Sequence, residues 1–426
     1  MKNEQLHLLP KHVAIKDRGK KLQPAPVDEK YGTQGYSYVL GQDAARHSIC
    51  TAVIASLTRP GVYYAAGYFY RTPDDKDYSF IQRLDADGKI EPGFIKFDAH
   101  LTQQLSFVPM EVVEDAAGKV LCLGRLYDAD TDFSRLWRFN ADGTLDNSFA
   151  DKGYVDGTEL TLDADFAPQF ISYTDGYLLI GSRDRTQILA ALDQNGNLKK
   201  DFGDGGVVDL EAIFKYRGSA SAMATSGQKI LVSFLATDAE QYFSVLASFN
   251  SNGTLDTAFA DQGMYRSENG IRHRGLSVHD ASAVITLFGH HLDDPALLYP
   301  QVQRLDASGQ PLLQFNDGKP VRFYAAGGWH HMYEFDGRLM GYGSFYTYHL
   351  AVCYTLEGTL DSSFVPPDGY GELGVDANSD GFFANSDASI AFVPESQRML
   401  VAGQGVYNNG FSADAAVAAI SYKMKS

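Results

Sequence analysis

Histidines are the residues of this chain whose type and grouping most readily suggest chemistry. Six of the eleven stand in polar and aromatic segments of the second half of the chain. They are His273, His290, His291, His330, His331 and His349. A neutral imidazole binds divalent metals, and histidine titrates near neutral pH. The group can therefore hold a metal ion or act as acid and base.

The neighbours of these histidines indicate a second chemistry. Arg274, Asp293, Trp329 and Tyr346 give them a polar and aromatic setting that suits a small molecule, a sugar or a peptide. Adjacent side chains in a strand point to opposite faces, so only one member of each histidine pair can reach a common site. The alternative is that long loops simply collect histidines and form no site.

A separate acidic segment has the spacing of a calcium loop. Asp376, Asn378 and Asp380 alternate before a glycine, and Asp387 occupies the twelfth position of the loop. Alternating carboxylate and amide oxygens of this kind can fold around Ca²⁺. The twelfth residue is Asp rather than Glu, and we expect no flanking helices. A loop that bonds only to itself is therefore the alternative.

Linear enzyme signatures are absent from the chain. It contains no G-x-S-x-G nucleophile elbow, no H-E-x-x-H and no phosphate-binding G-x-x-x-x-G-K-[ST]. A repeat scaffold can still assemble catalytic residues from distant segments, so a hydrolase or lyase that uses the histidines stays an alternative.

An internal repeat provides the elements that position these residues. Each repeat has an Asx-rich turn that ends in glycine and a phenylalanine six residues later. The turn glycines are Gly88, Gly143, Gly196, Gly253, Gly309 and Gly358, separated by 55, 53, 57, 56 and 49 residues. Asx-Gly turns favour hairpins because glycine adopts a positive φ without steric cost. We expect the leucine after the turn, as at Leu145, to open the next strand.

A second hairpin precedes each of these turns, as in the segments that end at Gly124, Gly181 and Gly343. Two hairpins give about four antiparallel strands per unit, which is typical of a propeller blade. The seventh unit is split between the chain ends, because residues 25–35 align with residues 253–263. We therefore predict an all-β, seven-bladed propeller over residues 25–426, closed by an N-terminal strand that completes the last blade. Residues 1–24 are basic and predict a flexible arm.

The repeated phrase of Asx-Gly, Leu-Asp and Phe resembles the bacterial delta-sixty repeat family. The match is strong in the units that end at Phe149 and Phe259 and weaker where Gln310 and Pro311 replace Thr-Leu. The resemblance implies a β-rich array that often occurs in surface or exported proteins. It carries no single activity and no catalytic residues.

Composition excludes several classes of protein. The chain has 426 residues, 44% of them apolar, so it can bury a large core. Its formal net charge of −17 disfavours nucleic acids and anionic membrane surfaces. No apolar run is long enough to span a membrane or to serve as a leader. We expect a location in the cytoplasm, or export without a cleavable signal peptide.

These observations favour a rigid recognition module over the alternatives of an enzyme and a purely structural or exported effector scaffold. Insertions vary on one face of the repeats, and function on repeat scaffolds usually resides on such a face. We therefore expect a small molecule, glycan or protein segment to bind on the variable-loop face, near the central channel and the fifth and sixth units.

Overall fold

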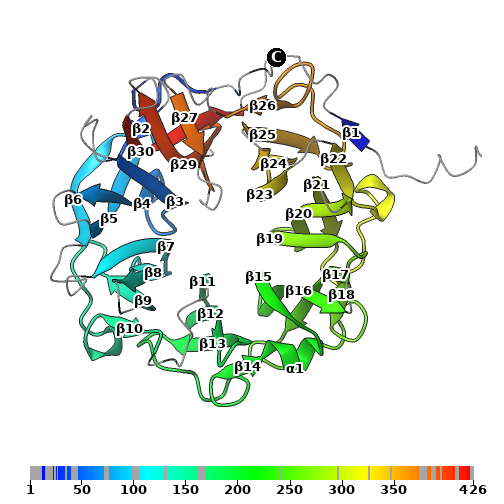
Figure 1. Ribbon diagram of the computed structural model, residues 1–426, viewed down its shortest axis with the longest axis horizontal. Coiled ribbons are helices and arrows are strands. Elements are labelled where there is room, and N and C mark those ends of the chain that lie inside the picture. Colours follow the sequence, from blue (N-terminus) through cyan, green and yellow to red (C-terminus); the bar gives the residue numbers. More distant parts are fainter. Residues whose placement is uncertain are drawn as a thin grey trace, which may run out of the picture. The chain divides into compact units, whose positions relative to one another are not determined.

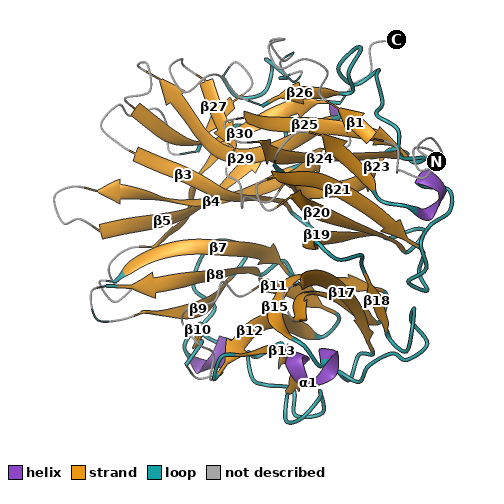
Figure 2. Ribbon diagram, turned by 45° about the vertical axis from the view of Figure 1, so that its right-hand side comes forward, coloured by secondary structure: helices purple, strands orange, loops and turns teal. Residues whose placement is uncertain are grey.

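The computed structural model describes residues 12–14, 23, 25, 27–33, 36–39, 47–71, 76–97, 105–128, 130, 132–158, 160, 169–238, 241–294, 297–324, 327–345, 348–373, 381–384, 390–393, 396–407 and 412–422. They form an all-β propeller of seven blades with four antiparallel strands in each blade (Figure 1). Strands and loops account for nearly all of the described chain, and the α-helix α1 (Leu210–Phe214) is short (Figure 2).

Four blades belong to a compact unit that comprises residues Pro26–Val208 and Leu373–Lys423. Blade 1 contains β3 (His47–Ala55), β4 (Val62–Arg71), β5 (Lys76–Asp85) and β6 (Ile90–Phe97). Blade 2 contains β7 (Ser106–Glu114), β8 (Val120–Tyr127), β9 (Asp132–Phe139) and β10 (Tyr154–Asp156). Blade 3 contains β11 (Gln169–Tyr173), β12 (Gly176–Arg183), β13 (Thr186–Asp193) and β14 (Val207–Asp209). Blade 7 contains β27 (Gly381–Ala384), β28 (Ile390–Val393), β29 (Arg398–Tyr407), β30 (Ser412–Ser421) and β2 (Tyr36–Tyr38).

Three blades belong to the other unit, Met1–Ala25, Asp209–Glu372 and Met424–Ser426, which contains most of the candidate residues. Blade 4 contains β15 (Arg217–Ser226), β16 (Lys229–Asp238), β17 (Gln241–Phe249) and β18 (Met264–Arg266). Blade 5 contains β19 (Ile271–His279), β20 (Val284–Asp294), β21 (Leu297–Leu305) and β22 (Val321–Tyr324), and β1 (His12–Ala14) pairs in parallel with β22. Blade 6 contains β23 (Gly328–Phe335), β24 (Arg338–Phe345), β25 (Tyr348–Thr355) and β26 (Tyr370–Glu372). Most of the basic arm predicted for residues 1–24 lies outside the described residues.

The two ends of the chain meet in blade 7, as the repeat predicted. Strand β2 pairs antiparallel with β30, and Val27 forms a bridge pair with Ile420. Arg398 Nε lies 2.6 Å from Asp28 Oδ2, which ties β29 to the N-terminal segment. The free edge of the last blade is thereby covered by a strand from the start of the chain.

The repeated aromatic residue packs against the turn glycine of the next unit. A Cβ placed on Gly196 would lie 2.8 Å from the ring of Phe149, and a Cβ on Gly309 would lie 2.6 Å from the ring of Phe259. In the split unit Tyr31 replaces the phenylalanine and packs in the same way on Gly88. The six turn glycines all have φ between 77° and 87°, so the turn favours glycine in each unit, and the ring contact adds a second requirement at Gly88, Gly196, Gly309 and Gly358.

The position predicted for the fourth strand is wrong. Leu145 forms only a single bridge pair with Phe139, and the outermost strand β10 begins later, at Tyr154. The intervening turn carries the buried Phe149. The chain must seat this ring against the next unit before it returns to the sheet, which delays the strand.

The three cysteines, Cys50, Cys122 and Cys353, are buried and free of disulfides. Burial raises the pKa of each thiol, so the three cysteines are small core residues of low reactivity. Within the described residues, no helix is long and apolar enough to cross a membrane.

Candidate functional site

A β-bulge interrupts the innermost strand of blade 5 and that of blade 6. The pairing of β19 with β20 shifts between His273 and Gly275, and that of β23 with β24 shifts between Trp329 and His331. Arg274 and His330 are therefore the extra residues. A similar shift occurs in the innermost strands of blades 1, 2 and 4, so the bulge is a feature of the repeat. It bends the strand and redirects a side chain, here those of Arg274 and His330.

Each bulge is accommodated by a glycine on the neighbouring strand. His273 pairs with Gly289, and Trp329 pairs with Gly343. A Cβ on Gly289 would lie 2.1 Å from the carbonyl oxygen of Arg272, and one on Gly343 would lie 2.4 Å from that of Gly328. Only glycine fits without a backbone shift. This explains why the upstream hairpins of these repeats end in glycine.

The two bulge residues contact each other across the seam between blades 5 and 6. Arg274 Nη1 lies 3.3 Å from His330 Nδ1, and His330 Nε2 lies 2.5 Å from Ser344 Oγ. A guanidinium can only donate, so Nδ1 of His330 accepts. Nε2 then carries the proton of the neutral imidazole and donates to the hydroxyl of Ser344.

His290 of blade 5 also lies at this seam. It pairs with Arg272 in the sheet, and its Nδ1 would lie 3.4 Å from a Cβ placed on Gly328. The same Cβ would lie 3.9 Å from Nη1 of Arg274. The missing side chain at Gly328 thus leaves room for the polar groups of blade 5. We call Arg274, His290, His330, Ser344 and His349 the seam cluster, in which His349 of β25 pairs with Ser344 of β24.

The histidines of the seam cluster are neutral at neutral pH. Burial, together with the charge of Arg274, lowers the pKa of His330 to about 2 and that of His290 to about 4. Burial also lowers the pKa of His349. Arg274 itself is exposed. The cluster therefore combines one exposed cation with uncharged hydrogen-bonding groups.

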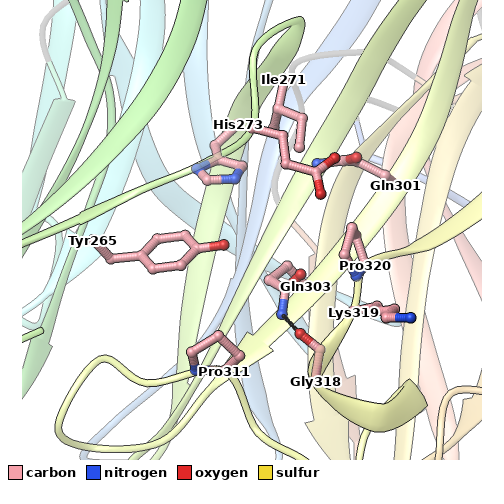
Figure 3. A pocket seen from close by; sticks show the side chains of 10 residues that line it. Tyr265, Ile271, His273, Gln301, Gln303, Pro311, Gly318, Lys319 and Pro320 are labelled. Atoms are coloured by element: carbon pink, nitrogen blue, oxygen red, sulfur yellow. Dashed lines mark hydrogen bonds between the residues drawn. The ribbon is translucent and has the colours of Figure 1, made fainter. Parts of the chain in front are cut away.

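His273 points away from the seam cluster. It is 1% exposed, lies on the opposite side of β19 from Arg274, and lines a pocket toward blade 4 (Figure 3). Burial lowers its pKa to about 3. Alternation along the strand therefore separates two neighbours that the sequence had grouped in one site.

Three other predicted residues serve packing. Trp329 is fully buried and packs against Phe323 and Tyr354, with ring centroids 5.4 and 6.3 Å away, so it cannot form the aromatic seat that we predicted. His331 stacks on Tyr342 at 5.6 Å, and the buried His291 lies against Gly270. The bulge at His330 is the reason that its neighbours Trp329 and His331 face packed surfaces.

Other predicted residues lie outside what the structure describes. Tyr346 and the calcium candidates Asp376, Asn378, Asp380 and Asp387 belong to undescribed segments, as does the side chain of Asp293. Among the described side chains, no group of three His, Cys, Asp or Glu residues is arranged to hold a metal ion. The described histidines thus give no support to the predicted histidine-bound metal.

Comparison with known proteins agrees with the propeller fold. Residues 118–149 match a family model described as a domain of unknown function, DUF5122, that forms a beta-propeller. No curated protein matches the chain.

Solved structures also resemble the chain. Sqt1 of Chaetomium thermophilum is 11% identical, with a TM-score of 0.47, over 89% of this chain and 96% of that one. The propeller domain of the trilobed protease of Pyrococcus furiosus is 8% identical, with a TM-score of 0.49, over 88% and 96%. The polysaccharide lyase Uly1 is 11% identical, with a TM-score of 0.44, over 94% and 98%. These likenesses carry no inference about function.

Proposed function

We propose that the chain is a recognition module and that its seam cluster binds a carboxylate-bearing ligand, such as an acidic glycan or an acidic peptide segment. The observation that carries this proposal is the contact between Arg274 and His330, which holds an exposed guanidinium at the edge of a neutral, hydrogen-bonding surface. A guanidinium has five N–H donors in a fixed fork that matches a carboxylate.

The charges around the cluster support an anionic ligand. Arg272 is a second exposed arginine of β19, and its charge, like that of Arg274, lowers the pKa of His290. The chain as a whole carries a net charge of −17, so two adjacent arginines make a local exception. Such a site attracts anions although the molecule repels them at long range.

The cluster supports binding better than it supports the alternative of a hydrolase or lyase. A catalytic histidine that activates a serine must accept the hydroxyl proton, and a carboxylate normally orients it. Here His330 accepts from Arg274 and directs its own proton toward Ser344. An imidazole whose pKa lies at about 2 is also a poor general base at neutral pH.

Titration calorimetry with uronate-containing oligosaccharides and acidic peptides tests this function. We expect at least one of these ligands to bind, and the Arg274→Gln variant to weaken its binding by about tenfold or more. The matched control is Arg217→Gln, which changes an exposed arginine on β15, the innermost strand of blade 4. Equal affinity in both variants, or no binding by the wild-type chain, would contradict the proposal.

The narrower family assignment also stays a proposal. The six turn glycines support membership of the delta-sixty repeat family, as do the buried Tyr31, Phe149, Phe202, Phe259, Phe315 and Phe364. A location in the cytoplasm, or export without a cleavable leader, likewise stays a prediction.

A further inference from the structure

A pocket of about 170 Å³ opens between blade 4 and blade 5, on the side of β19 that faces away from the seam cluster. Tyr265 of β18 forms the blade 4 wall, and His273, Gln301 and Gln303 form the blade 5 wall (Figure 3). In this view the four side chains surround a common space. A cavity of about 150 Å³ is large enough for a six-membered ring.

The pocket exists because of a row of three residues across blade 5. His273 on β19 pairs with Gly289 on β20, which pairs with Gln301 on β21. Side chains of paired residues share one face of a sheet. Since the central residue has no side chain, His273 and Gln301 are separated by an open floor.

Buried polar atoms in this pocket lack partners. Gln301 is fully buried, and neither its amide nitrogen nor its amide oxygen has a hydrogen bond with a described residue. The same holds for Nδ1 of His273. Gln303 differs, because its Nε2 donates to the carbonyl oxygen of Gly318 at 3.0 Å. Buried polar groups in native proteins are rarely left unpaired, so the free atoms indicate a missing partner.

The lining defines the chemistry of that partner. Glu268 and Lys319 are the charged residues that line the pocket, and both are exposed. Glu268 also lies 3.3 Å from the guanidinium of Arg322. The buried floor therefore holds no charge to bind an ion, and an apolar ligand would leave the amide of Gln301 unpaired. Tyr265 and His273 stay neutral at neutral pH, because burial raises the pKa of the first to about 12 and lowers that of the second to about 3.

We propose that this pocket binds one ring of a neutral polyhydroxylated ligand, a sugar or a related polyol, through Gln301 and His273. Each hydroxyl of such a ligand both donates and accepts, which matches an amide that offers both functions and an imidazole nitrogen. Ile271 and Pro320 add apolar surface for the carbon face of the ring. The site is independent of the seam cluster, and either can fail without the other.

Ligand-detected NMR with the full-length chain tests the proposal. The probes are glucose, galactose, mannose, rhamnose and myo-inositol, each beside a charged relative such as glucuronate or glucosamine. We expect at least one neutral probe to bind with a Kd of about 1 to 10 mM and its charged relative to bind more weakly. If no neutral probe binds, the pocket holds only water and the proposal is overturned. Tighter binding of the charged relative also overturns it.

Two pocket variants locate the binding. Gln301→Leu should weaken the binding of the neutral probe by about tenfold or more, because it removes both the hydrogen-bond donor and the acceptor of the amide. His273→Leu should weaken this binding by a similar factor, and it provides the test if Gln301→Leu fails to fold. The matched control is Gln194→Leu, the same type of change at an exposed turn of blade 3. Equal affinities in the control and both pocket variants would place the sugar elsewhere and overturn the proposal.

Discussion

Blades 5 and 6 share one backbone design but fill it in opposite ways. In both blades the innermost strand has a bulge, and the residue before the bulge faces a glycine on the next strand. In blade 6 this row reads Trp329, Gly343 and Leu350, and the indole fills the space. In blade 5 the row reads His273, Gly289 and Gln301, and the space is a pocket.

The comparison separates what the fold requires from what a ligand would require. The bulge and the glycine recur because the backbone geometry needs them, whatever side chains stand beside them. The side chains of the row are free to vary between an apolar core and a polar recess. A buried glutamine without a partner destabilises the folded state, so its presence in blade 5 favours a function over packing.

The largest expected effect is the loss of the indole in blade 6. Trp329→Ala should lower the free energy of unfolding by about 3 to 5 kcal/mol, because it removes a fully buried ring and leaves a cavity. Urea unfolding followed by circular dichroism measures the change. Leu313→Ala is the control: Leu313 is 72% exposed, so this variant should change stability by less than about 0.5 kcal/mol. If Trp329→Ala lost as little stability as the control, blade 6 would not depend on this side chain.

An intermediate effect is expected at the shared glycines. Gly289→Ala and Gly343→Ala should each destabilise the chain by about 2 kcal/mol, because the new Cβ would press on a backbone carbonyl oxygen in either blade. The two losses, measured by urea unfolding, should agree within about 0.5 kcal/mol. If Gly289→Ala left the free energy of unfolding unchanged while Gly343→Ala lowered it, the two bulges would not be equivalent.

The fold could be predicted from the sequence because its determinants are local and repeated. A turn glycine and a phenylalanine recur at a fixed spacing, and the same spacing around Tyr31 revealed the split blade. The fourth strand was misplaced because a single bridge pair at Leu145 looks like the start of a strand. Nothing in the sequence marks the turn that seats Phe149 first.

The candidate site could be predicted from the sequence only in part. His273, Arg274 and His330 were named, but the bulges decide which way each one points, and no residue type marks a bulge directly. Gln301 and Ser344 belong to no motif, since their role arises from strand pairing with distant residues. The glycines at the ends of the upstream hairpins were the one available signal, because they face the residues that precede the bulges.

An effect of similar size, which appears only at acidic pH, concerns the pH dependence of the polar row. In the unfolded chain His273 takes up a proton near its ordinary pKa of 6.5, whereas in the folded chain burial lowers that pKa to about 3. Between these values the unfolded state binds more protons, so stability decreases as the pH falls. At pH 5 this residue should reduce the free energy of unfolding by about 2 kcal/mol relative to pH 7.

Replacing His273 by glutamine tests this titration. The variant keeps a neutral polar side chain but cannot bind a proton, so its stability should fall less than that of the wild type between pH 7 and pH 5. Trp329→Phe is the matched control, because it alters the corresponding row of blade 6 without changing a titrating group and should keep the wild-type pH dependence. His290, His330 and His349 titrate in every variant, so the difference between variants isolates His273. Parallel pH profiles for the wild type and His273→Gln would mean that His273 is hydrated and can be protonated in the folded chain, and the row of blade 5 would then be an open surface.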